Sequence, residues 1–248
     1  MLVIQGDCMG KENWYSMEFR QAKVTKIVKE TSDIYSIQME IPEGYTWRAG
    51  QYAIWQLQDY VAPEGEKEDR VFTIASAMED HFLMFSTRIA DQHSWFKDIL
   101  LRQLEAGDTM LVSAPLGEMD IDMEGKERSL LIAGGIGVTP IRSLLRHYSS
   151  NNVPTHKIQL LYADNRGEFA YGDFWKQIEG KMPNVKLQLL TDSNVFAEKA
   201  RNYAVSHGNE AEYLIAGSPG MNQAFKKSLT EAGVSGGNMK TDEFFGYE

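Results

Sequence analysis

The hydrophobic pattern in the first half of the chain has a period of two. In the stretch 35–41, YSIQMEI, apolar residues take the odd positions, and Ser36, Gln38 and Glu40 take the even ones. Such alternation predicts a half-buried β-strand with the even positions facing outward. Similar runs follow at 51–57, 70–76 and 81–87, and turn residues separate them. With one helix expected near 95–104, these runs predict a small antiparallel β-barrel.

From about residue 128 the pattern changes to short apolar strands that alternate with helical stretches. The strands are expected at 130–133, 157–162, 185–190 and 213–216. Strands that alternate with helices predict a parallel sheet covered on both faces. We therefore expect two domains, an antiparallel β-barrel over 15–120 and an α/β parallel-sheet domain over 121–248. An N-terminal arm, 1–14, precedes them.

A glycine cluster follows the first expected parallel strand. Gly134, Gly135 and Gly137 lie between the strand and a helical pattern, with Thr139 expected as its N-cap and Pro140 at its first position. The helix places Ile141, Leu144, Leu145 and Tyr148 on one apolar face and Arg142 and Arg146 on an outward one. Two interpretations stay open: the free amides bind an anion, or the glycines only allow a tight turn and close packing.

A second turn of the same plan follows the last expected strand. Gly217 and Gly220 precede a helix, and Gly233 fits its C-terminal cap. The expected buried face of this helix is Met221, Ala224, Phe225, Ser228 and Leu229. Two glycine turns at the carboxyl edge of one parallel sheet favour a crevice for an extended ligand.

The barrel offers two candidate anion contacts. Arg70 begins an otherwise apolar run beside the acidic stretch 59–69, which is most simply a solvated loop. Its guanidinium suits a phosphate, although an ordinary surface ion pair would also explain it. Ser94 can cap a helix that starts at Trp95, with Arg88 and Lys97 nearby.

Composition and charge exclude several classes. The net charge of −10 argues against a nucleic-acid-binding protein. The single cysteine excludes a disulfide within this chain and an all-cysteine metal site. The five histidines show no metal-ligand spacing, so we expect surface or helix-end histidines and no metal. No apolar run reaches the roughly 18 residues of a membrane span, and the N-terminus does not read as a signal peptide, so we expect a cytoplasmic protein.

Taken in order, these motifs resemble the ferredoxin–NADP reductase superfamily. The resemblance rests on three motifs, namely Arg70-Val71-Phe72-Thr73, the stretch from Gly134 to Pro140, and Gly217-Ser-Pro219-Gly-Met221. The segment AGQY at 49–52 and the tail DEFFGYE at 242–248 are also similar to that family's motifs. The resemblance covers roughly residues 14–248.

The resemblance implies FAD on the barrel and NADH or NADPH on the second domain. Arg70 would hold the flavin phosphate, Thr73 would bond the hydride-accepting ring nitrogen, and Ser94 with the following amides would hold the pyrophosphate. The remaining implied flavin contacts are Val71, Phe72 and Arg88. The implied nucleotide contacts are Gly134, Gly135, Gly137, Thr139, Pro140, Asp164, Arg166, Gly217, Pro219 and Met221. Thr73, Glu243 and Phe244 are the implied catalytic residues. The tail would return to the flavin, with Phe244 or Phe245 covering the flavin face.

The implied activity is hydride transfer from NAD(P)H to FAD, followed by electron transfer to an unidentified acceptor. Two alternatives stay open: a reductase component for a separate haem, iron–sulfur or flavodoxin partner, and a non-catalytic flavin- or nucleotide-binding regulatory module. Phe72 stands where the family more often has tyrosine, and Ala216 where it often has cysteine.

Coenzyme preference depends on two residues that follow the second parallel strand. Asp164 can accept hydrogen bonds from a free ribose diol and repel a 2′-phosphate, whereas Arg166 could bind that phosphate. Arg166 could equally pair with Glu168 or Asp164. Because Asp164 lies closer to the strand end, we expect NADH to be used better than NADPH.

Overall fold

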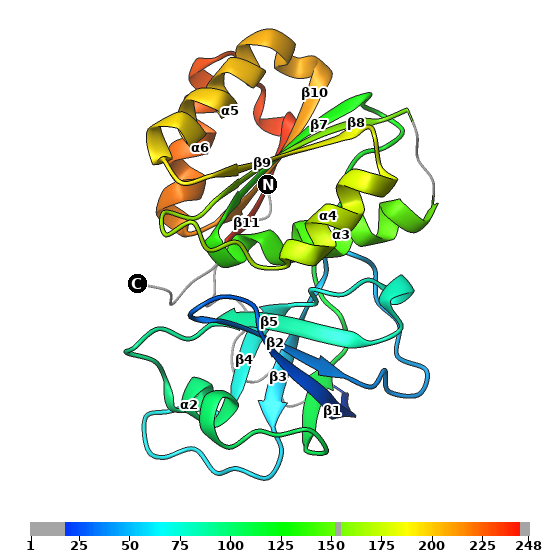
Figure 1. Cartoon of the computed structure of the whole chain (residues 1–248), viewed down its shortest axis with the longest axis vertical. Helices are drawn as coiled ribbons and strands as arrows, with labels where there is room; N and C mark the ends of the chain where they lie inside the picture. The colour runs from blue at the N-terminus through cyan, green and yellow to red at the C-terminus, as the bar shows by residue number, and fades with distance from the viewer. Residues whose placement is uncertain (1–17, 152–154, 244–248) are drawn as a thin grey trace. The chain divides into compact units, whose positions relative to one another are not determined.

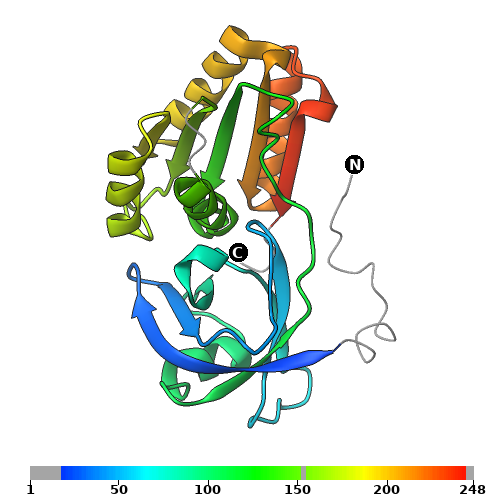
Figure 2. The same ribbon diagram turned by 90° about the vertical axis from the view of Figure 1, so that its right-hand side faces the viewer.

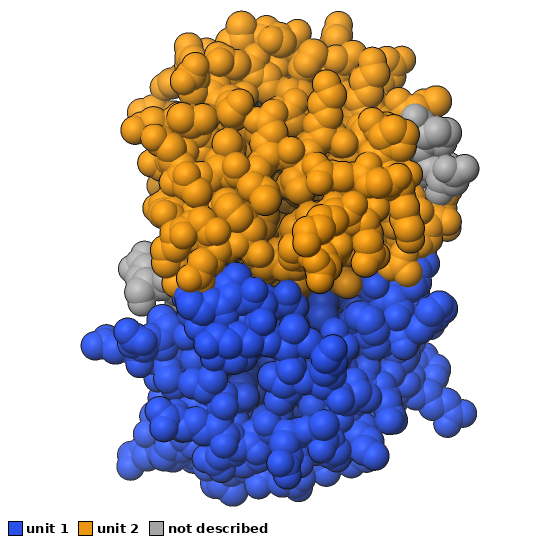
Figure 3. All heavy atoms as spheres, viewed as in Figure 1, with its two compact units in different colours: residues 1–118 blue, residues 119–248 orange. Residues whose placement is uncertain are grey.

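The computed structural model describes residues 18–151 and 155–243. The N-terminal arm, Phe244 and Phe245 therefore lie outside the described residues. The chain divides into two compact units, residues 1–118 and 119–248, which Figure 3 colours separately.

Unit 1 is a nearly closed antiparallel barrel. Its strands are β1 (Phe19–Lys29), β2 (Ile34–Met39), β3 (Tyr52–Leu57), β4 (Asp69–Thr73), β5 (Leu83–Arg88) and β6 (Thr109–Ser113). Their order is β4-β3-β6-β1-β2-β5, and a bridge between Ile74 and Phe85 joins the two ends of the sheet. The helices are η1 (Met78–Asp80) and α2 (Trp95–Arg102), and α2, at the lower left in Figure 1, buries Phe96, Ile99 and Leu100 in the barrel core. The predicted barrel is confirmed.

The period of two in β2 fails at one position. Ser36, which the alternation places outward, is fully buried. Its hydroxyl donates to Glu30 Oε1 at 2.8 Å and lies 2.7 Å from Ser86 Oγ on the neighbouring strand β5. A hydroxyl with partners on both sides can be buried without a large penalty.

Unit 2 is a five-stranded parallel sheet of order β11-β10-β7-β8-β9. The strands are β7 (Arg128–Gly134), β8 (Lys157–Ala163), β9 (Val185–Leu190), β10 (Ala211–Gly217) and β11 (Met239–Glu243). The α-helices are α3 (Val138–Asn151), α4 (Gly172–Lys181), α5 (Ser193–His207) and α6 (Pro219–Glu231). Short 3₁₀ turns are η2 (Gly135–Gly137), η3 (Gly208–Glu210) and η4 (Gly236–Asn238). The predicted α/β domain is confirmed, and β11 is a strand that the apolar pattern did not indicate.

The helices of unit 2 cover both faces of its sheet, as Figures 1 and 2 show. Helices α5 and α6 contribute Phe196, Ala200, Phe225 and Leu229 to one apolar core. On the other face α3 and α4 meet, and the expected apolar face of α3 is buried. Among the described residues, no helix has the length and apolar character needed to span a bilayer.

Three side chains lie elsewhere than their patterns predicted. Arg142 is buried rather than outward, because its guanidinium lies over the rings of Tyr171 and Phe174, 5.7 and 4.8 Å from their centroids. On α6, Ala224 is exposed and Asn222 is buried in its place. Burial of the Asn222 amide is tolerated because its Nδ2 donates a hydrogen bond to the carbonyl of Asp242 on β11 at 2.7 Å.

The expectation of surface histidines is wrong for His156, which is buried. Its Nε2 lies 2.8 Å from Ser129 Oγ, and burial lowers the pKa of the ring. The imidazole is therefore a core group that bonds to the neighbouring strand.

Candidate functional site

The first glycine turn of unit 2 is tighter than the sequence indicates. Strand β7 ends at Gly134 and passes into η2, where Gly135 has a φ of +53°. Helix α3 then begins at Val138, so Thr139 is not its N-cap. The Thr139 hydroxyl instead donates to the carbonyl of Ile136 at 3.0 Å, because the helix begins two residues earlier than expected, directly after η2.

Gly137 is needed for close packing. A Cβ at this position would collide with the carbonyl oxygen of Ala216 and lie 2.8 Å from the amide nitrogen of Gly217. Both atoms belong to the backbone of β10, which cannot yield as a side chain can. Of the two interpretations that the sequence left open, close packing therefore accounts for Gly137.

Gly134 and Gly217 have a different neighbour. A Cβ on either glycine would run into the thioether of Met221, from the first turn of α6. The Met221 side chain thus lies over the carboxyl ends of β7 and β10. Because its end is flexible, this is a contact that a ligand can displace.

The four strand ends at this edge form one row. Gly134 pairs with Ala163, and Gly217 pairs with Glu243 at the end of β11. In the second glycine turn Ser218 Oγ accepts a hydrogen bond from the amide of Met221, and a Cβ at Gly220 would meet nothing within 4 Å. The structure therefore brings both glycine turns, Pro219 and Glu243 to one edge, with open space at Gly220.

The loop after β8 holds Asp164 and Arg166 together. The buried Asp164 carboxylate accepts from the Arg166 amide at 3.0 Å, and Arg166 Nε lies 3.7 Å from the same oxygen. The Asp164 carbonyl also accepts from the amide of Gly167 at 3.0 Å. The two residues with opposite implied effects on coenzyme choice are thus partners of each other.

At the far end of the same edge, β11 carries two acidic residues. Burial raises the pKa of Asp242 to about 7, and the adjacent Glu243 is half-buried. A carboxyl group near neutrality at a strand end can change its protonation state in the physiological range.

In unit 1, Arg70 is folded back along its own chain. Its guanidinium donates to the carbonyls of Lys67 and Asp69 at 3.1 and 2.7 Å, and to Glu66 Oε2 at 3.3 Å. Its Cζ lies 5.4 Å from the centroid of the Phe96 ring. The guanidinium is therefore held close to the first turn of α2.

Glu66 joins the two anion contacts that the sequence predicted. One carboxylate oxygen pairs with Arg70, and the other accepts from the amide of Trp95, the first residue of α2, at 3.3 Å. The acidic stretch is thus not simply a solvated loop, since one of its carboxylates occupies a site between a guanidinium and a helix N-terminus.

Two further cations and one hydroxyl surround this position. Positive charge on Arg70 and Arg88 adds to burial, and together they lower the pKa of Lys97 to about 8. Arg88 Nε also pairs with Asp33 Oδ2 at 3.4 Å. Ser94 occupies the N-cap position of α2 without a side-chain cap bond, and its buried hydroxyl has no hydrogen-bond partner among the described residues. This cluster has excess positive charge and an unsatisfied polar atom.

The other residues of the Arg70 motif point in different directions. Val71 is exposed, whereas Phe72 is buried in the barrel core, where its ring stacks on Phe85 at 4.9 Å. Thr73 ends β4 opposite Tyr52 and is 5% exposed. Little of the Phe72 ring is thus available to a ligand.

Comparisons with known proteins give a match within unit 2 and a similarity of the whole fold. Residues 131–227 match the family model of the oxidoreductase NAD-binding domain. The whole fold is similar to cytochrome P450 reductase GcoB from Amycolatopsis, with a TM-score of 0.76 and 18% identity over 92% of this chain and 71% of that one. It is also similar to the FAD/NAD-binding domain of nitric oxide dioxygenase from Vibrio cholerae, with a TM-score of 0.72 and 19% identity over 91% of this chain and 98% of that one.

In its fold, and in the domain matched by the family model, the chain is similar to ferredoxin reductase-like proteins that bind FAD and NAD(P). In sequence the chain is 27% identical to a flavohemoprotein of Candida norvegensis over 237 residues. That alignment covers 92% of this chain but 58% of the relative, so the chain spans little more than half of that protein.

Two features of the site escaped the sequence patterns. Glu66 is one of several acids in its stretch, and its position four residues before Arg70 was the only signal for it. The effect of Met221 on the glycines depends on contact between β7 and the start of α6, residues far apart in the sequence.

Proposed function

We propose that this protein is an FAD-dependent oxidoreductase that takes hydride from NAD(P)H and passes electrons to a separate acceptor. The family model for an NAD-binding domain supports the nucleotide half of the proposal. The observation that carries the flavin half is the Glu66 carboxylate held between Arg70 and the start of α2.

The residues of this cluster fit the phosphates of FAD. The Glu66 carboxylate held there supports an anion at this position, and the unpartnered Ser94 hydroxyl can donate to a phosphate oxygen. Arg70, Arg88 and Lys97 would balance the charge of a pyrophosphate. When bound, the flavin would supply the capacity to accept a hydride and release electrons one or two at a time.

Each remaining predicted residue has a role that follows from its place. Thr73 would hydrogen-bond the flavin ring from the end of β4, and Val71 would offer an apolar surface beside it. On unit 2, Gly135, Thr139, Pro140 and Pro219 would border the nucleotide, and Met221 would move to admit it. Glu243 would lie beside the reacting ring, with Phe244 and Phe245 following it in the chain.

Two narrower assignments follow from relatives. The name of GcoB describes a cytochrome P450 reductase, and another relative in fold is the ferredoxin reductase of a carbazole dioxygenase. Both names favour a reductase with a protein acceptor that carries haem or iron–sulfur. A regulatory module that binds flavin and nucleotide without turnover is the alternative from another class. The cytoplasm stays our proposed location.

One experiment separates these assignments. The purified chain is titrated with FAD and then mixed with NADH or NADPH without oxygen, while flavin absorbance is followed. We expect bound flavin to be bleached at a catalytic rate, and Arg70→Ala to weaken FAD binding at least about tenfold. Flavin that binds but is not bleached would indicate the regulatory module. Unchanged FAD affinity in Arg70→Ala would refute the phosphate site.

A further inference from the structure

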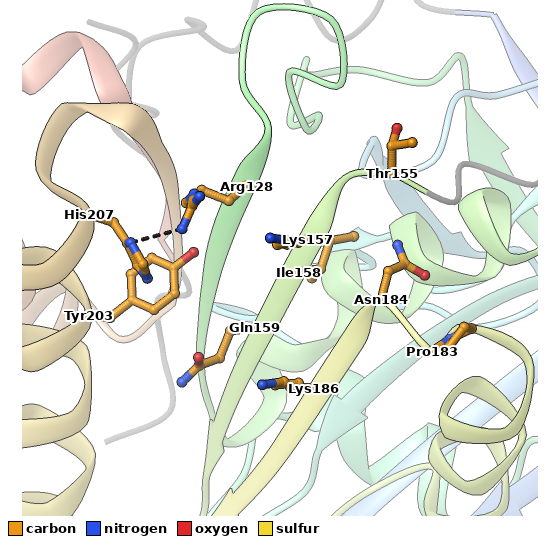
Figure 4. A pocket seen from close by; sticks show the side chains of 10 residues that line it. All are labelled: Arg128, Thr155, Lys157, Ile158, Gln159, Pro183, Asn184, Lys186, Tyr203 and His207. Carbon is orange, nitrogen blue, oxygen red and sulfur yellow. Dashed lines mark hydrogen bonds between the residues drawn. The ribbon is translucent and has the colours of Figure 1, made fainter.

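Unit 2 has a polar pocket at the opposite edge of its sheet from the glycine turns. It lies at the amino ends of β7, β8 and β9, beside the end of α5, and has a volume of about 500 Å³. Figure 4 shows Arg128 and His207 on one side and Lys157 and Lys186 on the strands that form the other. None of the residues assigned to FAD or NAD(P)H lines it.

The strands that form this pocket carry charged and polar residues near their amino ends, whereas strands inside a parallel sheet are usually apolar along their whole length. On the face toward α5, Leu130 and Leu161 belong to the apolar core. One step nearer the amino ends the same face carries Arg128 directly opposite Lys157, and Gln159 opposite Lys186. Like charges on directly opposite residues of neighbouring strands destabilise a sheet. Lys157 is exposed at the start of β8, so solvent screens part of this repulsion, and a bound anion would lower the rest.

The described residues that line this pocket include no acid, although Glu210 acts electrostatically on His207 from outside the lining. None of Arg128, Lys157 and Lys186 forms an ion pair among residues 18–151 and 155–243. This is notable because the chain has ten more acidic than basic residues. Arg128 Nη1 lies 2.9 Å from His207 Nδ1, and burial together with Arg128 lowers the pKa of that imidazole. The excess positive charge therefore resides on the arginine and two lysines.

We propose that this basic pocket binds a small molecule with two or more phosphate groups, at a site separate from both cofactor sites. A guanidinium binds phosphate in a bidentate manner, and two ammonium groups add point charges from neighbouring strands. Gln159 and Thr155 offer uncharged hydrogen-bonding groups on the same wall. A bound polyanion would lower the repulsion between Arg128 and Lys157.

The test uses the full chain with saturating FAD and NAD⁺, so that the cofactor phosphate sites are filled. Tripolyphosphate is titrated by calorimetry into the wild type, the Lys157→Gln/Lys186→Gln double variant and the Lys227→Gln control. Lys227 is an exposed lysine on α6 outside the pocket. We expect one site in the wild type and the control, and at least about tenfold weaker binding in the double variant.

Two further arms make the assignment specific. Citrate, a polyanion without phosphate, is expected to bind more weakly than tripolyphosphate. Tripolyphosphate is expected to protect Lys157 and Lys186, but not Lys227, from acetylation, as read by peptide mass spectrometry. No binding to the wild type, equal binding to the double variant, or citrate binding as tight as that of tripolyphosphate would overturn the proposal.

Discussion

Arg166 contacts Asp164 through a backbone hydrogen bond and a side-chain ion pair. Its amide donates to Asp164 Oδ1 at 3.0 Å, and its guanidinium Nε lies 3.7 Å from the same oxygen. The Asp164 side chain is buried and the Arg166 side chain is 43% exposed, so the aspartate is the fixed partner and the guanidinium the more mobile one. A 2′-phosphate would have to displace this contact to recruit Arg166.

This pairing leads to the first prediction. The wild type is expected to use NADH better than NADPH, and Asp164→Ser to shift the ratio of the two kcat/KM values toward NADPH by about tenfold. Steady-state kinetics with both coenzymes measures the ratio, with Arg166→Ala as the companion variant. A wild-type preference for NADPH that Arg166→Ala abolishes would show that the arginine binds the phosphate.

The second prediction concerns Glu66, which occupies the proposed flavin phosphate site. Its ion pair and its contact with the helix N-terminus are each worth about 0.3–1 kcal/mol, so Glu66→Gln should tighten FAD binding about 3- to 30-fold. The matched control is Glu64→Gln, which removes the same charge from an exposed position in the same loop. Fluorescence titration with FAD gives both affinities. Equal effects of the two substitutions would show that Glu66 affects FAD binding only through the net charge of the loop and does not occupy the phosphate site.

The third prediction separates packing from ligand contact in the glycine turns. Gly137→Ala should destabilise unit 2 by about 1–3 kcal/mol, because its methyl group would overlap the backbone of β10. Gly220→Ala lies in open space in the first turn of α6 and should leave stability unchanged or slightly raised. Urea unfolding of both variants measures the difference. A stable Gly137→Ala protein would contradict the close approach of the two turns.

The fourth prediction is a pH dependence of flavin binding. Burial and two neighbouring arginines lower the pKa of Lys97 to about 8, so the ammonium is charged below that pH and loses its proton above it. A bound phosphate favours the charged form, and FAD affinity should therefore fall as pH rises from about 8. In Lys97→Arg the positive charge persists and this fall should disappear. Titrations between pH 7 and 10 decide the matter, and a wild-type affinity that is flat across this range would exclude Lys97 from the site.

The fifth prediction tests the Thr73 hydroxyl. Thr73→Val keeps the volume and the strand preference but removes the hydrogen bond proposed for the flavin ring. Flavin reduction by NADH should slow by about tenfold or more, whereas Thr73→Ser should retain most of the rate. Anaerobic stopped-flow absorbance gives these rates in protein saturated with FAD. If the flavin in Thr73→Val is reduced at the wild-type rate, the Thr73 hydroxyl has no part in hydride transfer.

Local patterns determined the two-unit fold and the identity of most candidate residues. The period of two in the first half and the apolar strands at 130–133 and 213–216 depend on neighbours close in the chain, so they can be read without the structure. The motifs around Arg70, Gly134 and Gly217 pointed to the superfamily for the same reason. The residue roles derived from them remain predictions.

Tertiary contacts alone decided how several of these residues are used. Gly137 is required by the Ala216 carbonyl, about 80 residues later in the chain, and Arg142 is buried by rings of the α4 region. Glu66 reaches Trp95 only because the barrel brings its loop to the start of α2. Sequence periodicity reports which face of an element is apolar, but it carries no information on which distant backbone or charge meets that face.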